Sequence, residues 1–132
     1  MAKGIIGINN HSSSGGGTTI DLLWSNDLPS EDTNYTLTDS IDNYDWIRII
    51  YCTNAESQSH EIPVDIIKLH YGTDWGISAT YFGHTSGGQT DLLTYRTSAV
   101  TRFQSATTFR YITMYNDANL KMKPIRIYGI KC

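Results

Sequence analysis

The sequence has little of what several protein classes require. There are only two cysteines, Cys52 and Cys132, in 132 residues, and two are too few for a disulfide scaffold. Because Cys132 is the last residue, where a fixed partner is hard to guarantee, we expect free thiols and synthesis in a reducing compartment, with a Cys52–Cys132 bridge as the open alternative. No apolar run approaches the roughly 18 residues of a membrane-spanning helix, so no membrane insertion is expected. The first ten residues have one lysine and no long apolar stretch, which predicts no secretory signal.

Basic charge is also scarce. Lys and Arg total 10 against 13 Asp and Glu, which gives a net charge of −3. A protein that neutralises several phosphates needs a basic face, so the composition argues against nucleic-acid binding. One local basic stretch is present, which we interpret as a solvated edge beside the last strand. It consists of Lys121, Lys123, Arg126 and Lys131.

The length is that of one domain, and a chain of this size can bury roughly two-thirds of its unfolded surface in a single core. Residues 1–17 differ from the rest because Ser and Gly fill positions 12–17, the composition of a flexible linker. A short apolar patch precedes this linker, formed by Ile5, Ile6 and Ile8. The patch either docks on a partner or folds back as an extra edge strand, and we favour docking or exchange between subunits. We therefore divide the chain into a flexible or docking peptide, 1–17, and a folded domain, 18–132.

Residues 18–132 have the composition and patterning of strands. Nine Tyr, three Trp and three Phe accompany many Thr, Ile and Val, and these residue types favour pleated, half-buried surfaces. Alternation and turn signals predict eight or nine short strands, at residues 18–24, 33–39, 46–53, 62–70, 75–84, 91–97, 100–104, 108–115 and 125–131. The fold class expected from this pattern is all-β, an antiparallel β-sandwich of jelly-roll type with little helix. One helical turn is expected near residues 39–43, capped by Ser40 or Asp39.

Two strands carry further expectations. Both faces of the segment from Trp46 to Tyr51 are apolar or aromatic, which predicts a strand in the middle of a sheet that is covered on both sides. Gly129 interrupts the last strand, which indicates a bulge or a close approach of another part of the chain.

The sequence contains no recognisable catalytic or metal-binding motif. None of the four histidines, at positions 11, 60, 70 and 84, has a partner at ligand spacing, and neither cysteine lies in a C-x-x-C motif. There is no G-x-S-x-G, no P-loop and no dinucleotide turn. Carboxylates for a polysaccharide-cleaving pair are candidates by elimination only, namely Asp65, Asp74 and Asp91, and nothing pairs them. Calcium is conceivable in the loop with Asp27, Glu31 and Asp32, although its spacing matches no EF-hand. We therefore predict a binding protein, with no enzyme activity and no cofactor.

Aromatic residues supply the best candidate for ligand binding. Several lie in one central stretch of the sequence with a carboxylate and an imidazole, and rings of this kind can stack on sugars while polar neighbours bind the hydroxyls. The candidate ligand-binding residues are Tyr71, Asp74, Trp75, Tyr81, His84 and Tyr95. The alternative is that these aromatics fill the core or a subunit interface.

Three segments together resemble a known family. They are residues 22–26 (LLWSN), 41–51 (IDNYDWIRIIY) and 124–131 (PIRIYGIK). An opening LW-x-N, a central YD-aromatic-I strand and a closing GIK resemble the C-terminal domains of tail-fibre and minor structural proteins of tailed bacteriophages. The resemblance spans roughly residues 20–132 and includes no catalytic signature.

The resemblance implies a virion protein made in the host cytoplasm, assembled as a trimer at a fibre tip, that recognises a host-surface glycan or protein. Those fibre tips follow a long stalk, whereas a Gly/Ser linker precedes the domain here. The N-terminal peptide would then attach the domain to other virion proteins or to a neighbouring subunit. A head-fibre, capsid-decoration or tail-joining protein without a receptor is the alternative, and a polysaccharide-degrading enzyme is a minor one.

Overall fold

The computed structural model describes residues 17–54, 56–86, 92–117 and 120–132. The predictions made for Ile5, Ile6, Ile8 and Asp91 therefore lie outside the described residues. In the described part of the chain, no helix combines the length and the apolar character needed to cross a membrane.

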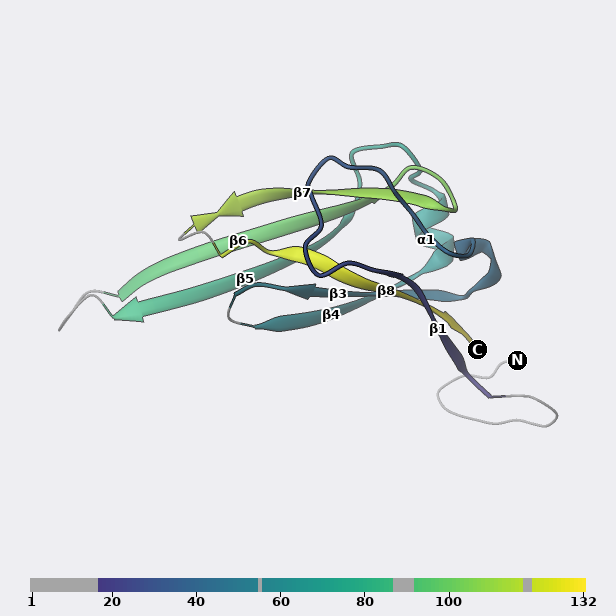
Figure 1. The fold of residues 1–132 in the computed structure, drawn as a ribbon, viewed down its shortest axis with the longest axis horizontal. Coiled ribbons are helices and arrows are strands. Elements are labelled where there is room, and N and C mark those ends of the chain that lie inside the picture. Colours follow the sequence, from purple (N-terminus) through teal and green to yellow (C-terminus); the bar gives the residue numbers. More distant parts are fainter. Residues whose placement is uncertain (1–16, 55, 87–91, 118–119) are drawn as a thin grey trace.

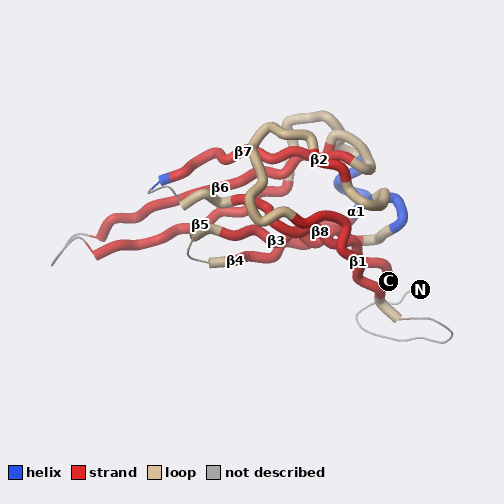
Figure 2. Tube along the Cα trace, in the orientation of Figure 1, coloured by secondary structure: helices blue, strands red, loops and turns tan. Residues whose placement is uncertain are grey.

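Two antiparallel sheets of four strands each make up the described chain (Figures 1 and 2). The first sheet has the strand order β1 (Thr19–Ser25), β8 (Lys123–Lys131), β3 (Trp46–Cys52) and β4 (Ser57–Pro63). The second has the order β2 (Tyr35–Thr36), β7 (Thr108–Asn116), β6 (Leu92–Phe103) and β5 (Ile77–Ser86). The predicted all-β antiparallel sandwich is confirmed. The chain crosses between sheets after β1, β2, β4 and β7, whereas β3–β4 and β5–β6–β7 are hairpins within one sheet.

The core lies between the two sheets and is mainly aromatic and aliphatic. From the first sheet, Ile47, Ile49 and Tyr51 are completely buried. From the second, Phe109 is completely buried and meets Trp24 edge-on, with 4.8 Å between ring centroids. Such edge-to-face pairs contribute beyond the apolar area that they bury, so these rings hold the two sheets together.

The prediction for strand β3 is half right. It is an inner strand, paired with β8 on one side and β4 on the other. It is not covered on both faces, because Trp46 is 39% exposed while Ile47 is fully buried. Successive side chains of a strand point to opposite faces, so the apolar residues of the second face lie on the outside of the sandwich.

The prediction of a strand at residues 62–70 is wrong. Strand β4 ends at Pro63, and the helix α1 (Val64–Lys68) follows directly. Val64 and Ile67, three residues apart, are buried, whereas Ile66 is exposed, which is the period of a helix rather than of a strand. Pro63 stands at the N-cap position, where a proline ends the strand pairing without removing a hydrogen bond of the helix.

The first five residues of β4, Ser57–Glu61, are polar, which is why the apolar pattern missed them. The strand SQSHEIP is an edge strand that pairs along its whole length with β3. An edge strand does not need an apolar face on both sides, and polar residues protect such an edge from unwanted pairing. Its place was set by the neighbour β3 rather than by its own hydrophobicity.

Two further strand boundaries differ from the prediction. The strands expected at 91–97 and 100–104 are parts of one long strand, β6 (Leu92–Phe103), because Ser98 and Ala99 between them remain in the ladder. There, buried Thr97 accepts a hydrogen bond from the N–H of Met122 (3.0 Å), and Ser98 bonds to Thr80 (3.1 Å). The strand expected at 33–39 is only two residues long, and Leu37 instead bonds to the backbone of the β6–β7 loop.

Several local predictions are confirmed. A short 3-10 helix covers Ile41–Asn43, and the Ser40 hydroxyl accepts a hydrogen bond from the N–H of Asp42 (3.1 Å). Gly129 allows a close approach, since a Cβ atom there would lie 2.6 Å from Cγ of Tyr44. Cys52 and Cys132 are free thiols.

Candidate functional site

The loop that connects α1 to β5 contains three of the predicted ligand-binding residues. Trp75 is half-buried, and its ring stacks on that of His70 with 4.6 Å between centroids and 20° between planes. Thr73 fixes the turn because its hydroxyl donates to the carbonyl of His70 (2.8 Å) and accepts from the N–H of Trp75 (3.2 Å). One face of the Trp75 ring is therefore already occupied by an intramolecular partner.

The neighbours of Trp75 in this loop are unequal candidates. Tyr71 packs against the core, and its hydroxyl oxygen is buried with no hydrogen-bond partner among the described residues. Burial, and secondarily the charge of Asp42, raises the pKa of Tyr71 above its ordinary value. Asp74 is exposed to solvent. This loop thus offers a ligand one free carboxylate and part of one indole ring.

The other three predicted residues lie along the β5–β6 hairpin. Tyr81 is half-buried and packs against the core. His84 and Tyr95 occupy β5 and β6, where their backbones pair with Thr94 and Gly83, and their side chains lie outside what the structure describes. His84 is seven residues beyond the start of β5, a rise of about 23 Å. The six predicted residues therefore do not form one site, because the loop and the hairpin end point away from each other (Figure 1).

A different set of side chains forms an exposed planar cluster on the outer face of the second sheet. Phe82 is 57% exposed and Tyr115 is 44% exposed. Phe82 lies opposite Arg96 in the β5–β6 ladder, and Tyr115 lies opposite Ser98 in the β6–β7 ladder. We call the three side chains Phe82, Arg96 and Tyr115 the planar cluster.

Two members of the planar cluster, Arg96 and Tyr115, are held by contacts with each other and with Asp117. The guanidinium carbon of Arg96 lies 3.8 Å from the centre of the Tyr115 ring, a cation–π contact. Asp117 accepts a hydrogen bond from the backbone N–H of Arg96 (3.1 Å), and its carboxylate lies 3.9 Å from Nε of the same residue. These contacts orient Arg96 and Tyr115 before any ligand arrives, so these two side chains would lose little freedom on binding.

The alternation of β5 is the signal that could have identified this cluster. Ile77 and Ala79 are buried, so Tyr81 shares their inward face and Phe82 points outward. The residue predicted from this strand was Tyr81 rather than Phe82. Tyr115 could not be assigned in this way, because the β6–β7 register shifts between Ser98 and Ala99.

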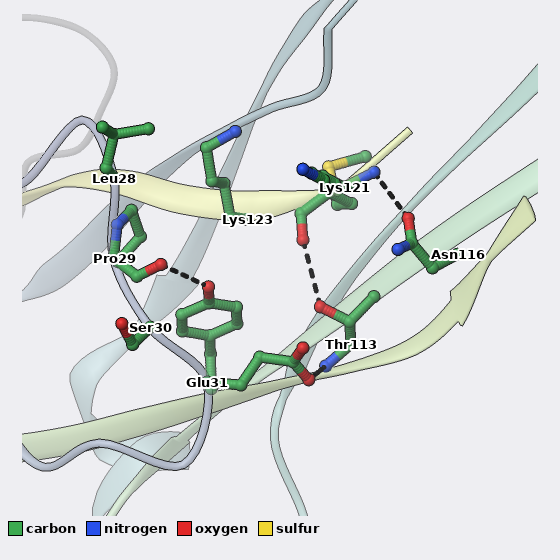
Figure 3. A pocket seen from close by; sticks show the side chains of 10 residues that line it. Leu28, Pro29, Ser30, Glu31, Thr113, Asn116, Lys121 and Lys123 are labelled. Carbon is green, nitrogen blue, oxygen red and sulfur yellow. Dashed lines mark hydrogen bonds between the residues drawn. The ribbon is translucent and has the colours of Figure 1, made fainter. Parts of the chain in front are cut away.

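A groove of about 380 Å³ opens between the two sheets, beside the β1–β2 loop (Figure 3). The loop, strand β7 and the turn before β8 contribute its walls. The lining residues are Leu28, Pro29, Ser30, Glu31, Tyr111, Thr113, Asn116, Lys121, Met122 and Lys123.

Most polar groups of this groove are used inside the protein. The carboxylate of Glu31 accepts from the N–H of Thr113 (2.7 Å), and the hydroxyl of Tyr111 donates to the carbonyl of Pro29 (3.0 Å). Burial is the main cause that raises the pKa of Tyr111 to about 12, and the charges of Glu31 and Tyr35 contribute less. The hydroxyl therefore stays protonated at neutral pH and continues to donate, which makes the groove wall a structural element.

Carboxylates considered for calcium do not converge on one point. Asp27 pairs with Arg126 at 2.9 Å, and Asp32 lies 4.0 Å from Arg110. Glu31 is held by Thr113. In residues 17–54, 56–86, 92–117 and 120–132, no three His, Cys, Asp or Glu side chains are grouped as a metal site would require.

The basic stretch is also divided. Lys121 and Lys123 line the groove, Arg126 is paired with Asp27, and Lys131 ends strand β8. The four positive charges thus have different surroundings rather than one common face.

A comparison with models of known protein families finds no match for this chain, and a comparison with curated protein sequences finds none either.

Proposed function

We propose that this chain is a bacteriophage virion surface protein with a fibre-tip-like domain, which binds a host-surface glycan or protein and performs no catalysis. The planar cluster of Phe82, Arg96 and Tyr115 carries this proposal. Aromatic and arginine side chains are enriched among the residues that carry most of the binding energy of recognition surfaces. An aromatic ring in addition buries a large area with few rotatable bonds. Phe82 and Tyr115 expose aromatic rings on either side of Arg96, and neighbouring exposed rings of this kind favour a partner.

The position of the cluster supports attachment at one end and recognition at the other. Strand β1 begins at Thr19, close to the C-terminus, while the β5–β6 hairpin extends to the far end of the molecule (Figure 1). Phe82 and Arg96 lie on the part of that hairpin nearer its tip. A peptide that anchors the domain before β1 would leave the planar cluster pointing away from the particle.

The test is a binding measurement on the native chain and two single variants. Phe82→Ser and Tyr115→Ser should each weaken binding to the best ligand of a glycan array, or to intact bacterial cells, by about tenfold or more. Leu28→Ser is the matched control, since Leu28 is 84% exposed but lies on the β1–β2 loop. Equal binding by both cluster variants, the control and the native chain would contradict the placement of the ligand.

The alternative function is a structural virion protein without a receptor, in which the domain decorates a capsid or joins tail parts. One observation favours it, because the outer face of the first sheet exposes Ile20, Leu22 and Trp46, as expected of a surface covered in an assembly. If the native chain binds neither glycans nor cells, yet residues 1–17 are essential for incorporation into particles, this alternative replaces the first. The expected trimer is tested separately by light scattering, where a stable monomer at micromolar concentration would contradict it.

A further inference from the structure

The outer face of the first sheet has an apolar surface that crosses several strands. Register places Ile20, Ile130, Trp46 and Pro63 in one row from β1 through β8 and β3 to β4. In the next row, Leu22 lies opposite Tyr128. We call these six residues the outer apolar face.

Burial shows that this face has no cover within the described chain. Ile20 is 49% exposed, Leu22 is 50% exposed and Trp46 is 39% exposed. Only Ile130, between the side chains of its row, is buried, at 7%. In a sandwich the outward positions normally alternate as polar residues, so an apolar row across a whole sheet indicates that something covers it.

An ion pair borders the outer apolar face on one side. In the second row, Arg48 pairs with Glu61 at 2.6 Å, which leaves no unpaired charge where β3 meets β4. We therefore expect the segment that covers this face to be apolar and uncharged. A charged segment would gain little attraction from charges that are already paired at the rim.

We propose that the outer apolar face is the docking site for the apolar segment at residues 5–8 of this chain, which contains Ile5, Ile6 and Ile8. The segment is apolar, as the outer apolar face requires. It also precedes β1, the strand at one edge of that face. The chain enters the face at Thr19, the neighbour of Ile20 in β1. This surface is separate from the planar cluster, so the inference goes beyond the proposed function.

Length permits this docking. Ten residues separate Ile8 from Thr19, and such a spacer reaches at most about 35 Å. Four neighbouring strands span only about 14 Å from the first to the last. A Gly/Ser spacer of this length also holds the segment near the face at an effective concentration in the millimolar range. The segment can therefore reach the face of its own chain or that of a neighbouring copy.

The experiment uses Trp46 and the segment as reporters of each other in the full-length chain. The variant Ile5→Asp/Ile6→Asp/Ile8→Asp should shift the indole N–H resonance of Trp46 and leave that of buried Trp24 in place. The matched control Asn9→Asp/Asn10→Asp/Ser12→Asp adds the same charge nearby, retains the isoleucines and should leave both resonances unchanged.

The reverse arm changes the face and observes the segment. Thermolysin cleaves before large apolar residues, so docking should protect the segment. Trp46→Ser should accelerate this cleavage by about tenfold or more, whereas Leu28→Ser should not. Adding full-length chain to isotopically labelled chain that lacks residues 1–17 shows which copy supplies the segment. A shift of the labelled Trp46 resonance means that a neighbouring copy supplies it, and a shift seen only within the full-length chain means that the same copy does. Both results support the proposal.

Two outcomes would overturn it. The first is that the Trp46 resonance does not shift when the three isoleucines are replaced, and that the rate of segment cleavage does not change in Trp46→Ser. The second is an oligomer, measured by light scattering, that Trp46→Ser dissociates and the isoleucine variant does not. That result would assign the face to direct contact between two copies of the sheet.

Discussion

At the scale of single residues, the contact between Tyr44 and Gly129 fixes how the 3-10 turn sits on the first sheet. The Tyr44 ring lies directly on the glycine, and its hydroxyl lies 2.8 Å from a carboxylate oxygen of Asp21 and 3.0 Å from one of Asp39. Burial, and secondarily these two carboxylates, raises the pKa of Tyr44 well above its ordinary value. The side chain therefore remains a neutral donor throughout the physiological range.

Adding a methyl group at position 129 should disturb this contact. In Gly129→Ala, the new Cβ atom would lie 2.6 Å from Cγ of Tyr44, so the ring or the strand must move. We expect a loss of about 1–3 kcal/mol in the free energy of unfolding, measured by urea denaturation. Gly17→Ala is the control, because nothing lies within 4 Å of a Cβ atom there. If both variants unfold with the same free energy, the Tyr44 ring and its turn can shift without loss of stability.

At the scale of elements, a five-residue helix replaces the strand that the apolar run suggested. Helices this short have little stability of their own, so α1 depends on the two side chains that it buries, Val64 and Ile67. The run VDIIKLH fits a strand and a helix about equally well, and only the core beneath it selects one. The polar strand β4 is the complementary case, since pairing with β3 fixes it.

The helix predicts unequal roles for two adjacent isoleucines. Ile67→Ala should lower the free energy of unfolding by about 2–5 kcal/mol, because Ile67 is 1% exposed and the substitution leaves a cavity. Ile66→Ala should cost less than about 1 kcal/mol, because Ile66 is 40% exposed. Thermal or urea denaturation of both variants measures the difference. A larger loss at Ile66 would mean that this face of α1 is covered in solution.

At the scale of the whole molecule, a buried polar contact joins the two sheets within the core. The hydroxyl of Tyr51, from β3, donates to the carbonyl of Ile77 in β5 (3.0 Å). Since its only hydrogen is used there, the Thr101 hydroxyl of β6 donates to it in turn (2.6 Å). Burial raises the pKa of Tyr51, so the hydroxyl remains protonated. These bonds set the relative position of the sheets.

Removing that hydroxyl should destabilise the molecule as a whole. Tyr51→Phe leaves the carbonyl of Ile77 and the hydroxyl of Thr101 without this partner, and we expect a loss of about 1–3 kcal/mol in the free energy of unfolding. Tyr128→Phe, on the outer face of the same sheet, should change it by less than about 0.5 kcal/mol. Identical urea midpoints for the two variants would argue that water reaches the Tyr51 site.

The candidate site shows where prediction from the sequence ended. Aromatic content in the central region suggested a binding site there, but the six predicted residues are spread over a loop and a long hairpin. Selecting Phe82 needed the inward or outward sense of β5, which depends on what the strand packs against. Selecting Tyr115 needed the register shift beside Ser98, which no single strand encodes.

The sequence by itself determined the all-β class, the capped turn at Ile41–Asn43 and the close approach at Gly129, because alternation, caps and glycines act over a few neighbouring residues. Only the tertiary structure decided that β4 is a strand and α1 a helix, that β6 is continuous, and that the second face of β3 lies open. These features depend on partners distant in the sequence, whose backbone hydrogen bonds and packing outweigh local preference.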